Sequence, residues 1–240
     1  MKIIVTGGCG YIGSVLIPKL LSMKIKVINI DAQYFGIYLK ENKYLKNIKC
    51  DINNISKISF KNVYAIIHLA SIANDPMAEI DKNLSWETSA LGTLGLLQRA
   101  KKFKVKRFIY ASSGSVYGIS KKNRVDENTN LKPISLYNKV KMCTEKIVES
   151  YKNYLEIFVI RPATVCGYSP RMRYDVSVNA LTFSALKYKT IKVFGGKQIR
   201  PNIHMEDMVN LYIYLLNANK KYCGTYNAGF ENKSILEIAK

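Results

Sequence analysis

A tyrosine and a lysine four residues apart, Tyr137 and Lys141, have the types and spacing best suited to proton transfer. In the helix expected over residues 134–152, this spacing places both side chains on one face. A tyrosine hydroxyl has an ordinary pKa of about 10, and a neighbouring ammonium group favours the phenolate. The pair therefore predicts a general base. Because such pairs are common by chance, two exposed helix residues are the alternative.

Serines follow one of the expected strands and place hydroxyl groups where a ligand would bind. The run over residues 110–118 contains Ser112, Ser113 and Ser115, and it continues a strand expected over residues 105–111. Ligands of open α/β sheets bind at the carboxyl ends of the strands. This position favours a functional role for the tyrosine and the lysine.

Three glycines, Gly7, Gly10 and Gly13, follow the apolar run over residues 3–5. A strand, a glycine turn and a helix in this order let the backbone hold a pyrophosphate at the helix N-terminus. Asp31 ends a second apolar run, about 20 residues further on, where a carboxylate binds ribose hydroxyls and repels a 2′-phosphate. We therefore expect NAD rather than NADP. An ordinary turn residue is the alternative for Asp31.

Short apolar runs alternate with longer helical patterns, which is typical of βαβ units around a parallel sheet. The fold class is therefore expected to be α/β, a Rossmann-type doubly wound parallel sheet. Strands are expected over residues 2–6, 25–31, 47–50, 63–69, 105–111, 155–160, 191–194 and 225–227. Helices are expected over residues 11–22, 53–58, 80–102, 134–152, 175–188 and 206–218. A further helix begins near Ser234 and stops at Lys240 without a capping signal, so the chain looks cut short.

Bulk composition excludes several classes of protein. A chain of 240 residues with 48% apolar composition can bury a sizeable core, and it contains no apolar run long enough for a membrane span. Five cysteines without a C-x-x-C pair and two histidines argue against a metal site, and they fit a reducing cytoplasm. The net charge of +20 is spread along the chain, so we expect a solvated surface and no nucleic-acid partner. RNA binding through the dense cluster from Lys101 to Arg107 is the alternative.

The glycine turn, Asp31, the serine-rich strand end and the Tyr137–Lys141 pair occur in this order along the chain. Together they resemble the extended short-chain dehydrogenase/reductase family, in its nucleotide-sugar epimerase/dehydratase branch, over all 240 residues. The resemblance implies NAD as cofactor, a nucleotide sugar as substrate and a homodimer. It also implies an NAD-binding Rossmann domain over residues 1–165 and a partial substrate-binding region, interleaved with it, over residues 166–240.

The resemblance assigns a role to each matching residue. Ser113 would be the catalytic hydroxyl, Tyr137 the base, and Lys141 the bridge between the nicotinamide ribose and the tyrosine. Asn179 and Arg200 would contact the substrate, Arg200 at its diphosphate, with a surface ion pair as the alternative for Arg200. The remaining cofactor contacts would be Gly7, Gly10, Tyr11, Ile12, Gly13, Asp31, Asp51, Ile52, Leu69 and Ala70.

Several positions depart from the pattern of this branch. Dehydratases follow the catalytic hydroxyl with an Asp-Glu pair, but this chain has Gly114 and Ser115, so 4,6-dehydration is disfavoured. Ser89 and Thr164 replace two asparagines, which weakens the substrate contacts inferred there. The segment over residues 166–179 resembles a subgroup that includes heptose 4-dehydrogenases, and its Arg171 and Arg173 are either anion-binding groups or surface charges. We expect an NAD-dependent nucleotide-sugar 4-epimerase, with a 4-dehydrogenase or a non-catalytic dinucleotide-binding protein as alternatives.

Overall fold

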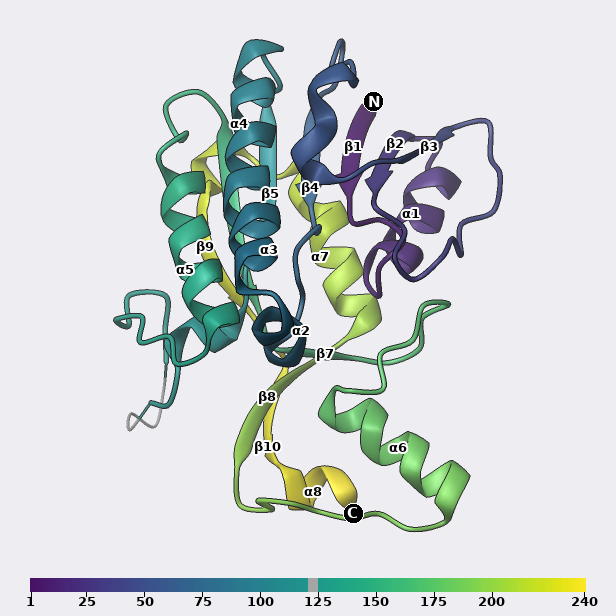
Figure 1. Cartoon of the computed structure of the whole chain (residues 1–240), viewed down its shortest axis with the longest axis vertical. Helices are drawn as coiled ribbons and strands as arrows, with labels where there is room; N and C mark the ends of the chain where they lie inside the picture. Colours follow the sequence, from purple (N-terminus) through teal and green to yellow (C-terminus); the bar gives the residue numbers. More distant parts are fainter. Residues whose placement is uncertain (121–124) are drawn as a thin grey trace.

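The computed structural model describes residues 1–120 and 125–240, and a sheet of seven parallel strands forms its centre (Figure 1). The strands lie in the order β3-β2-β1-β4-β5-β6-β9. Their bounds are β1 Lys2–Thr6, β2 Lys26–Asp31, β3 Leu45–Lys49, β4 Ala65–His68, β5 Arg107–Ala111, β6 Glu156–Pro162 and β9 Gly224–Ala228. The expected doubly wound parallel sheet is confirmed.

Helices cover both faces of this sheet, because successive apolar residues of its strands point to opposite sides. Ile3 and Val5 of β1 pack in one core with α1 (Gly13–Ser22) and α7 (Met205–Asn217). Ile4 packs in the other core. The helices of that second face are α4 (Gly92–Lys102) and α5 (Leu136–Glu149), which lie in front of the sheet in Figure 1.

The strand order reverses between β1 and β4, since the chain adds β2 and β3 on one side of β1 and then returns to its other side. At this point, the Thr6 hydroxyl hydrogen-bonds the Nδ1 atom of His68 at 2.6 Å, which joins the ends of the two strands. In doubly wound sheets, the crevice beyond such a reversal is where ligands bind. The glycine turn follows β1, Leu69 and Ala70 follow β4, and the serines follow β5. The fold therefore gathers the expected motifs at one edge of the sheet.

A smaller sheet of three strands lies beside this edge, below the main sheet in Figure 1. Its central strand runs antiparallel to one neighbour and parallel to the other. The strands are β7 Thr164–Cys166, β8 Ile199–His204 and β10 Glu231–Ser234, and the helices near them are α6 Ser177–Tyr188 and α8 Ile235–Ala239. Along the chain, α7 and β9 lie between β8 and β10, and they belong to the main sheet and its helical layer.

Three expectations for secondary structure are wrong or incomplete. No strand forms over residues 191–194, where the Phe194 side chain is 82% exposed. The single helix expected over residues 80–102 is divided, because Asp81 has an extended backbone and its side chain caps the next helix. After α2 Asp75–Ile80, which ends where the expected helix begins, the chain forms α3 Lys82–Trp86, a π-helical turn at Glu87–Leu91, and α4. Strands β7, β8 and β10 were not predicted, since none of them contains a continuous apolar run.

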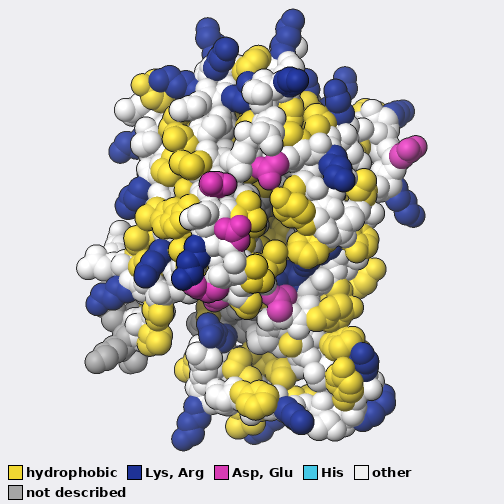
Figure 2. Space-filling model, viewed as in Figure 1, with side chains coloured by type: hydrophobic (Ala, Val, Ile, Leu, Met, Phe, Trp, Pro, Cys, Tyr) yellow, Lys and Arg dark blue, Asp and Glu magenta, His cyan; other side chains and the backbone are white. Residues whose placement is uncertain are grey.

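Basic side chains are spread over the face of the molecule shown in Figure 2, whereas carboxylates gather near its middle. The positive charge on this face is therefore not concentrated in one patch. Among the described residues, no helix is long and apolar enough to cross a membrane.

Candidate active site

The glycine turn after β1 is packed too tightly for side chains at two of its positions. Gly7 has a φ of 71°, and a Cβ atom there would lie 2.6 Å from the backbone nitrogen of Ala70. A Cβ atom on Gly13 would lie 2.4 Å from the Cα atom of Gly8. The two glycines thus allow the turn to cross the start of α1 and the end of β4 at close range.

The same turn offers free backbone donors. Over residues 1–120 and 125–240, no acceptor meets the N–H groups of Tyr11 and Ile12, and no side chain caps α1. Unpaired N–H groups and the positive end of the helix dipole together bind phosphate well. The residues present therefore fit the pyrophosphate of NAD.

Asp31 is held beside this turn by two backbone donors. Its carboxylate oxygens accept hydrogen bonds from the N–H groups of Cys9 at 2.9 Å and Gln33 at 2.6 Å. Asp51 caps a short 3₁₀ helix at Ile52–Lys57, and the Tyr34 hydroxyl donates to it at 3.4 Å. Both carboxylates lie at the carboxyl ends of neighbouring strands, β2 and β3, and their contacts with the adenosine half of NAD stay predictions.

Gly13→Ala is expected to weaken NAD binding by at least about tenfold, because the new methyl group must push the turn away from α1. Gly95→Ala is the matched control, since a Cβ atom at Gly95 meets nothing within 4 Å. In the middle of α4, that change should stabilise the protein by about 0.5–1 kcal/mol. Titration with NAD, followed by calorimetry, measures both variants. Equal NAD affinities would contradict a role for Gly13 in shaping the cradle.

Two predicted contact residues bind each other rather than facing outward. The Tyr11 hydroxyl donates to the carbonyl oxygen of Gly167 at 2.6 Å, and the Asn179 amide donates to that hydroxyl at 3.0 Å. Asn179 also accepts from the N–H of Gly167 and donates to the carbonyl of Arg173. These bonds fix the segment after β7 against the glycine turn. A direct contact between Asn179 and substrate stays a prediction.

Two of the three catalytic candidates, Tyr137 and Lys141, lie on α5, and the third, Ser113, follows β5. Ser113 follows β5, and Tyr137 lies in the first turn of α5, whose N-terminus is capped by Ser135. The Lys141 amine donates to the carbonyl of Ala111 at 2.7 Å and lies 5.9 Å from the centre of the Tyr137 ring. The helix therefore places the tyrosine and the lysine on one face beside the serine.

The pKa of Tyr137 is raised above its usual value, mainly because burial disfavours the phenolate. Hydrogen bonding with Ser113 and the positive charge of Arg173 act in the opposite direction. The lowered pKa that was expected for Tyr137 is therefore not found, since desolvation outweighs the favourable neighbours. The local sequence reveals the lysine but not the depth at which the hydroxyl is buried.

Lys141 itself is 3% exposed, and burial lowers its pKa to about 7, with the carboxylate of Glu145 acting against that shift. The unfolded chain binds a proton at Lys141 up to a pH near 10.5, whereas the folded chain releases it near 7. The contribution of Lys141 to stability should therefore rise with pH between these values. We expect the unfolding free energy of the protein, minus that of Lys141→Met, to increase across this window. A flat difference in denaturant titrations would contradict the shift.

A buried charge network behind the catalytic candidates was missed by the sequence analysis. Glu145, which is fully buried, pairs with Arg161 at 2.7 Å and accepts a hydrogen bond from the Ser112 hydroxyl. Glu145 follows Lys141 by one helical turn, so helical spacing could have indicated it. Its partner on β6 could not be identified from spacing. The network joins β5, α5 and β6 directly behind Ser113.

Ser89, in the π-helical turn, is also committed to internal bonds. Its hydroxyl lies 3.0 Å from that of Ser71 and accepts from the N–H of Ile72 at 3.3 Å, and the residue is 3% exposed. Ser89 therefore joins the segment after β4 to the π-helical turn by hydrogen bonds. Little of the Ser89 surface is left for contact with a ligand.

The arginines differ in their surroundings. Arg200 is exposed on β8, opposite Lys233 of β10, so its contact with a diphosphate stays a prediction. Arg173 forms a two-point ion pair with Asp175, at 3.0 and 2.6 Å, and its charge acts on Tyr137. Arg171 lies 3.9 Å from the centre of the Phe35 ring. Of these three arginines, Arg173 is thus the one that the structure brings to Tyr137.

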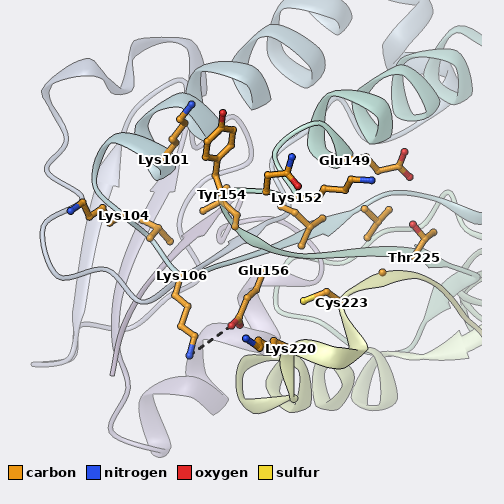
Figure 3. Close-up of a pocket in the computed structure, with 16 residues that line it drawn as sticks. Lys101, Lys104, Lys106, Glu149, Lys152, Tyr154, Glu156, Lys220, Cys223 and Thr225 are labelled. Carbon is orange, nitrogen blue, oxygen red and sulfur yellow. Dashed lines mark ion pairs between the residues drawn. The ribbon is translucent and has the colours of Figure 1, made fainter.

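A hollow of about 1160 Å³ lies at the other edge of the sheet, beside the first residues of β6 and β9 (Figure 3). Its lysines are Lys101, Lys104, Lys106, Lys152 and Lys220. Lys106 pairs with Glu156 at 3.8 Å, and the Lys101 amine lies 3.5 Å from the centre of the Tyr154 ring. Arg107, from the same basic cluster, is buried against Glu156 at 2.5 Å. Part of the cluster is therefore bound within the protein, away from Tyr137.

Comparison with known proteins agrees with this geometry. The chain is 33% identical to an uncharacterized UDP-glucose epimerase of Bacillus subtilis, over 99% of this chain and 80% of the relative. It is 28% identical to the UDP-glucose 4-epimerase of Lactobacillus helveticus, over 100% of this chain and 81% of the relative.

A solved structure is similar as well. UDP-glucuronic acid 4-epimerase from Bacillus cereus, in complex with UDP-glucuronic acid and NAD, superposes with a TM-score of 0.88 at 30% identity, covering 98% of this chain and 80% of that one. The model of the NAD dependent epimerase/dehydratase family matches residues 3–229. The expected cofactor, NAD, is thereby confirmed. The chain belongs to the NAD dependent epimerase/dehydratase family.

Proposed function

We propose that this enzyme is a nucleotide-sugar 4-epimerase acting on a UDP-hexose. The observation that carries the proposal is the arrangement of Ser113, Tyr137 and Lys141 at the sheet edge where the NAD cradle lies. The relatives named above, which are epimerases of UDP-sugars, support the choice of nucleotide and reaction.

In this proposal, the side chains of the site move one proton and hold one oxygen. NAD, when bound, supplies a reversible hydride acceptor. The Ser113 hydroxyl donates to the Tyr137 phenolate before the reaction. Tyr137 takes the proton of the sugar 4-hydroxyl, and Ser113 then donates its hydrogen bond to the same sugar oxygen. The 4-keto sugar then turns its other face to the site, and Tyr137 returns the proton. Lys141, held by the carbonyl of Ala111, fixes a donor beside the tyrosine.

Elimination of water is not supported by the residues after Ser113. Gly114 has no side chain, and the Ser115 hydroxyl lies against Ser113 and Asn138. Neither residue provides the carboxylate that acid–base elimination needs. The proposal is therefore epimerisation, although the family contains dehydratases as well.

The test is to incubate the enzyme and NAD with UDP-hexoses, UDP-hexuronic acids and the matching GDP-sugars, and to analyse the products by nuclear magnetic resonance. Conversion of a UDP-sugar to its C4 epimer, without net reduction of NAD, is the expected result. Accumulation of a keto sugar with reduced cofactor would instead identify a 4-dehydrogenase. No conversion of any sugar, with NAD binding demonstrated, would leave the non-catalytic binder as the better description.

A further inference from the structure

Two side chains outside the catalytic set continue a chain of hydrogen bonds from Ser113. The Ser113 and Ser115 hydroxyl oxygens lie 2.7 Å apart, and the Ser115 hydroxyl lies 2.5 Å from the side-chain oxygen of Asn138. The Ser115 N–H also donates to the Ser113 hydroxyl at 3.2 Å. Asn138 directly follows Tyr137 in α5, so the chain of bonds returns to the residue next to the base.

The number of hydrogens in this chain determines its direction. Each serine hydroxyl has one hydrogen to donate, whereas the asparagine amide has an acceptor end and a donor end. With the amide oxygen toward Ser115, that serine donates to Asn138, Ser113 donates to Ser115, and Ser113 presents a lone pair to Tyr137. With the amide nitrogen toward Ser115, every donor reverses and Ser113 donates toward Tyr137. The structure has the amide oxygen toward Ser115, and a half-turn of the amide, which exchanges its oxygen and nitrogen, gives the second direction.

Only the second direction suits a phenolate, because a phenolate accepts hydrogen bonds and a phenol donates one. We propose that Asn138, acting through Ser115, positions the hydroxyl of Ser113 and so sets how readily Tyr137 ionises. This inference rests on the function proposed above, in which Tyr137 is the base. Asn138 and Ser115 are positioning residues in it and do not contact the substrate.

Packing holds the chain of bonds in place. Asn138 is 7% exposed, and its backbone N–H is bound by the side chain of Ser135 at 3.2 Å. A Cβ atom at Gly114 would lie 3.1 Å from the carbonyl oxygen of Pro162, so the turn that contains Gly114 packs tightly against the end of β6. The charged and titratable groups that face Tyr137 from other elements are Asp75, Tyr110, Arg173 and Tyr212, and Lys141 faces it from α5 itself.

The experiment compares Asn138→Asp with and without the Ser115 hydroxyl. A carboxylate at this position only accepts hydrogen bonds, so Asn138→Asp should turn Ser113 away from Tyr137 and raise the pKa of the tyrosine by about one unit. The new charge alone would also raise that pKa, with or without the Ser115 hydroxyl. If the effect passes through Ser115, adding Asn138→Asp to the Ser115→Ala variant should give less than about half the shift.

Each variant is measured in two ways. The first is the pH dependence of kcat and KM of the enzyme with NAD bound. The second is the ¹³C signal of Tyr137 in labelled protein without sugar, which is assigned by its loss in Tyr137→Phe. Asn138→Asp is expected to move the kcat profile to higher pH while KM stays within about twofold. Ser115→Thr keeps the hydroxyl, so Asn138→Asp in that background should again give the full shift in the pKa of Tyr137. The matched controls are Ser150→Ala, at the exposed residue that ends α5, and Asn210→Asp, at an exposed site on α7.

Equal shifts from Asn138→Asp in the two backgrounds would overturn the proposal and leave a through-space charge effect. Epimerase activity that survives in Tyr137→Phe would instead show that Tyr137 is not the base, and this would also overturn the positioning role of Asn138. An inactive Tyr137→Phe together with equal shifts would reject the positioning role alone. Thermal unfolding of each variant shows whether the chain still folds.

Discussion

Replacing Tyr137 with phenylalanine is expected to lower the rate of UDP-sugar interconversion by about 10²- to 10⁴-fold, the usual contribution of a general acid–base group. The change removes one oxygen and keeps the ring, whose centre lies 5.9 Å from the Lys141 amine. Since burial raises the pKa of this hydroxyl, its removal takes away a partly desolvated polar group. The protein should therefore fold normally and bind NAD as before. The loss should appear in kcat, with little change in KM.

Tyr214→Phe is the matched control, because that tyrosine is 64% exposed on α7 and its change should leave turnover unaltered. Initial rates with the best UDP-sugar and calorimetric NAD titration measure both variants. If Tyr137→Phe kept more than about a tenth of the parent rate, the proton would have to move through another group. The proposed function would then need a different base.

The parts of the site that depend on local backbone geometry were predictable. Gly7 and Gly13 are glycines because close backbone contacts leave no room for a Cβ atom, and that need shows directly in the sequence. Asp31 was expected from its distance to the turn, and it lies against the N–H of Cys9. Tyr137 and Lys141 share a face because helical periodicity is a local property.

Properties that depend on tertiary packing were not predictable. The direction of the Tyr137 pKa shift follows from its burial, to which elements distant in sequence contribute. The enclosure of Asn179 depends on Tyr11, 168 residues away. Strand β10 has the sequence Glu-Asn-Lys-Ser, which carries no strand signal, and it forms because β8 offers it an edge. The extent of desolvation and pairing is set by partners that spacing does not identify.

Glu145→Ala is expected to lower the free energy of unfolding by about 3–5 kcal/mol, the usual result of removing one partner from a buried ion pair. Arg161 is 6% exposed, and its guanidinium would lose both of its bonds to the carboxylate, at 3.0 and 2.7 Å. The remaining bonds, to the Tyr117 hydroxyl at 2.7 Å and to the carbonyl oxygen of Glu127 at 3.4 Å, do not neutralise the charge. Denaturant unfolding should show this as a lower midpoint with an unchanged slope.

The double variant Glu145→Leu with Arg161→Met distinguishes a lost attraction from a stranded charge. Two apolar side chains of similar size should recover most of the lost stability, because the pair is costly to desolvate and its removal leaves no buried charge. The surroundings of Lys141 and Ser113 should nevertheless stay altered in the double variant. Glu145 raises the pKa of Lys141, and it accepts a hydrogen bond from the hydroxyl of Ser112, next to Ser113. Recovered stability with a Lys141 pKa well below 7 would show that Glu145 matters more to the site than to the fold. A double variant as unstable as Glu145→Ala would show that the pair itself holds β6 to α5.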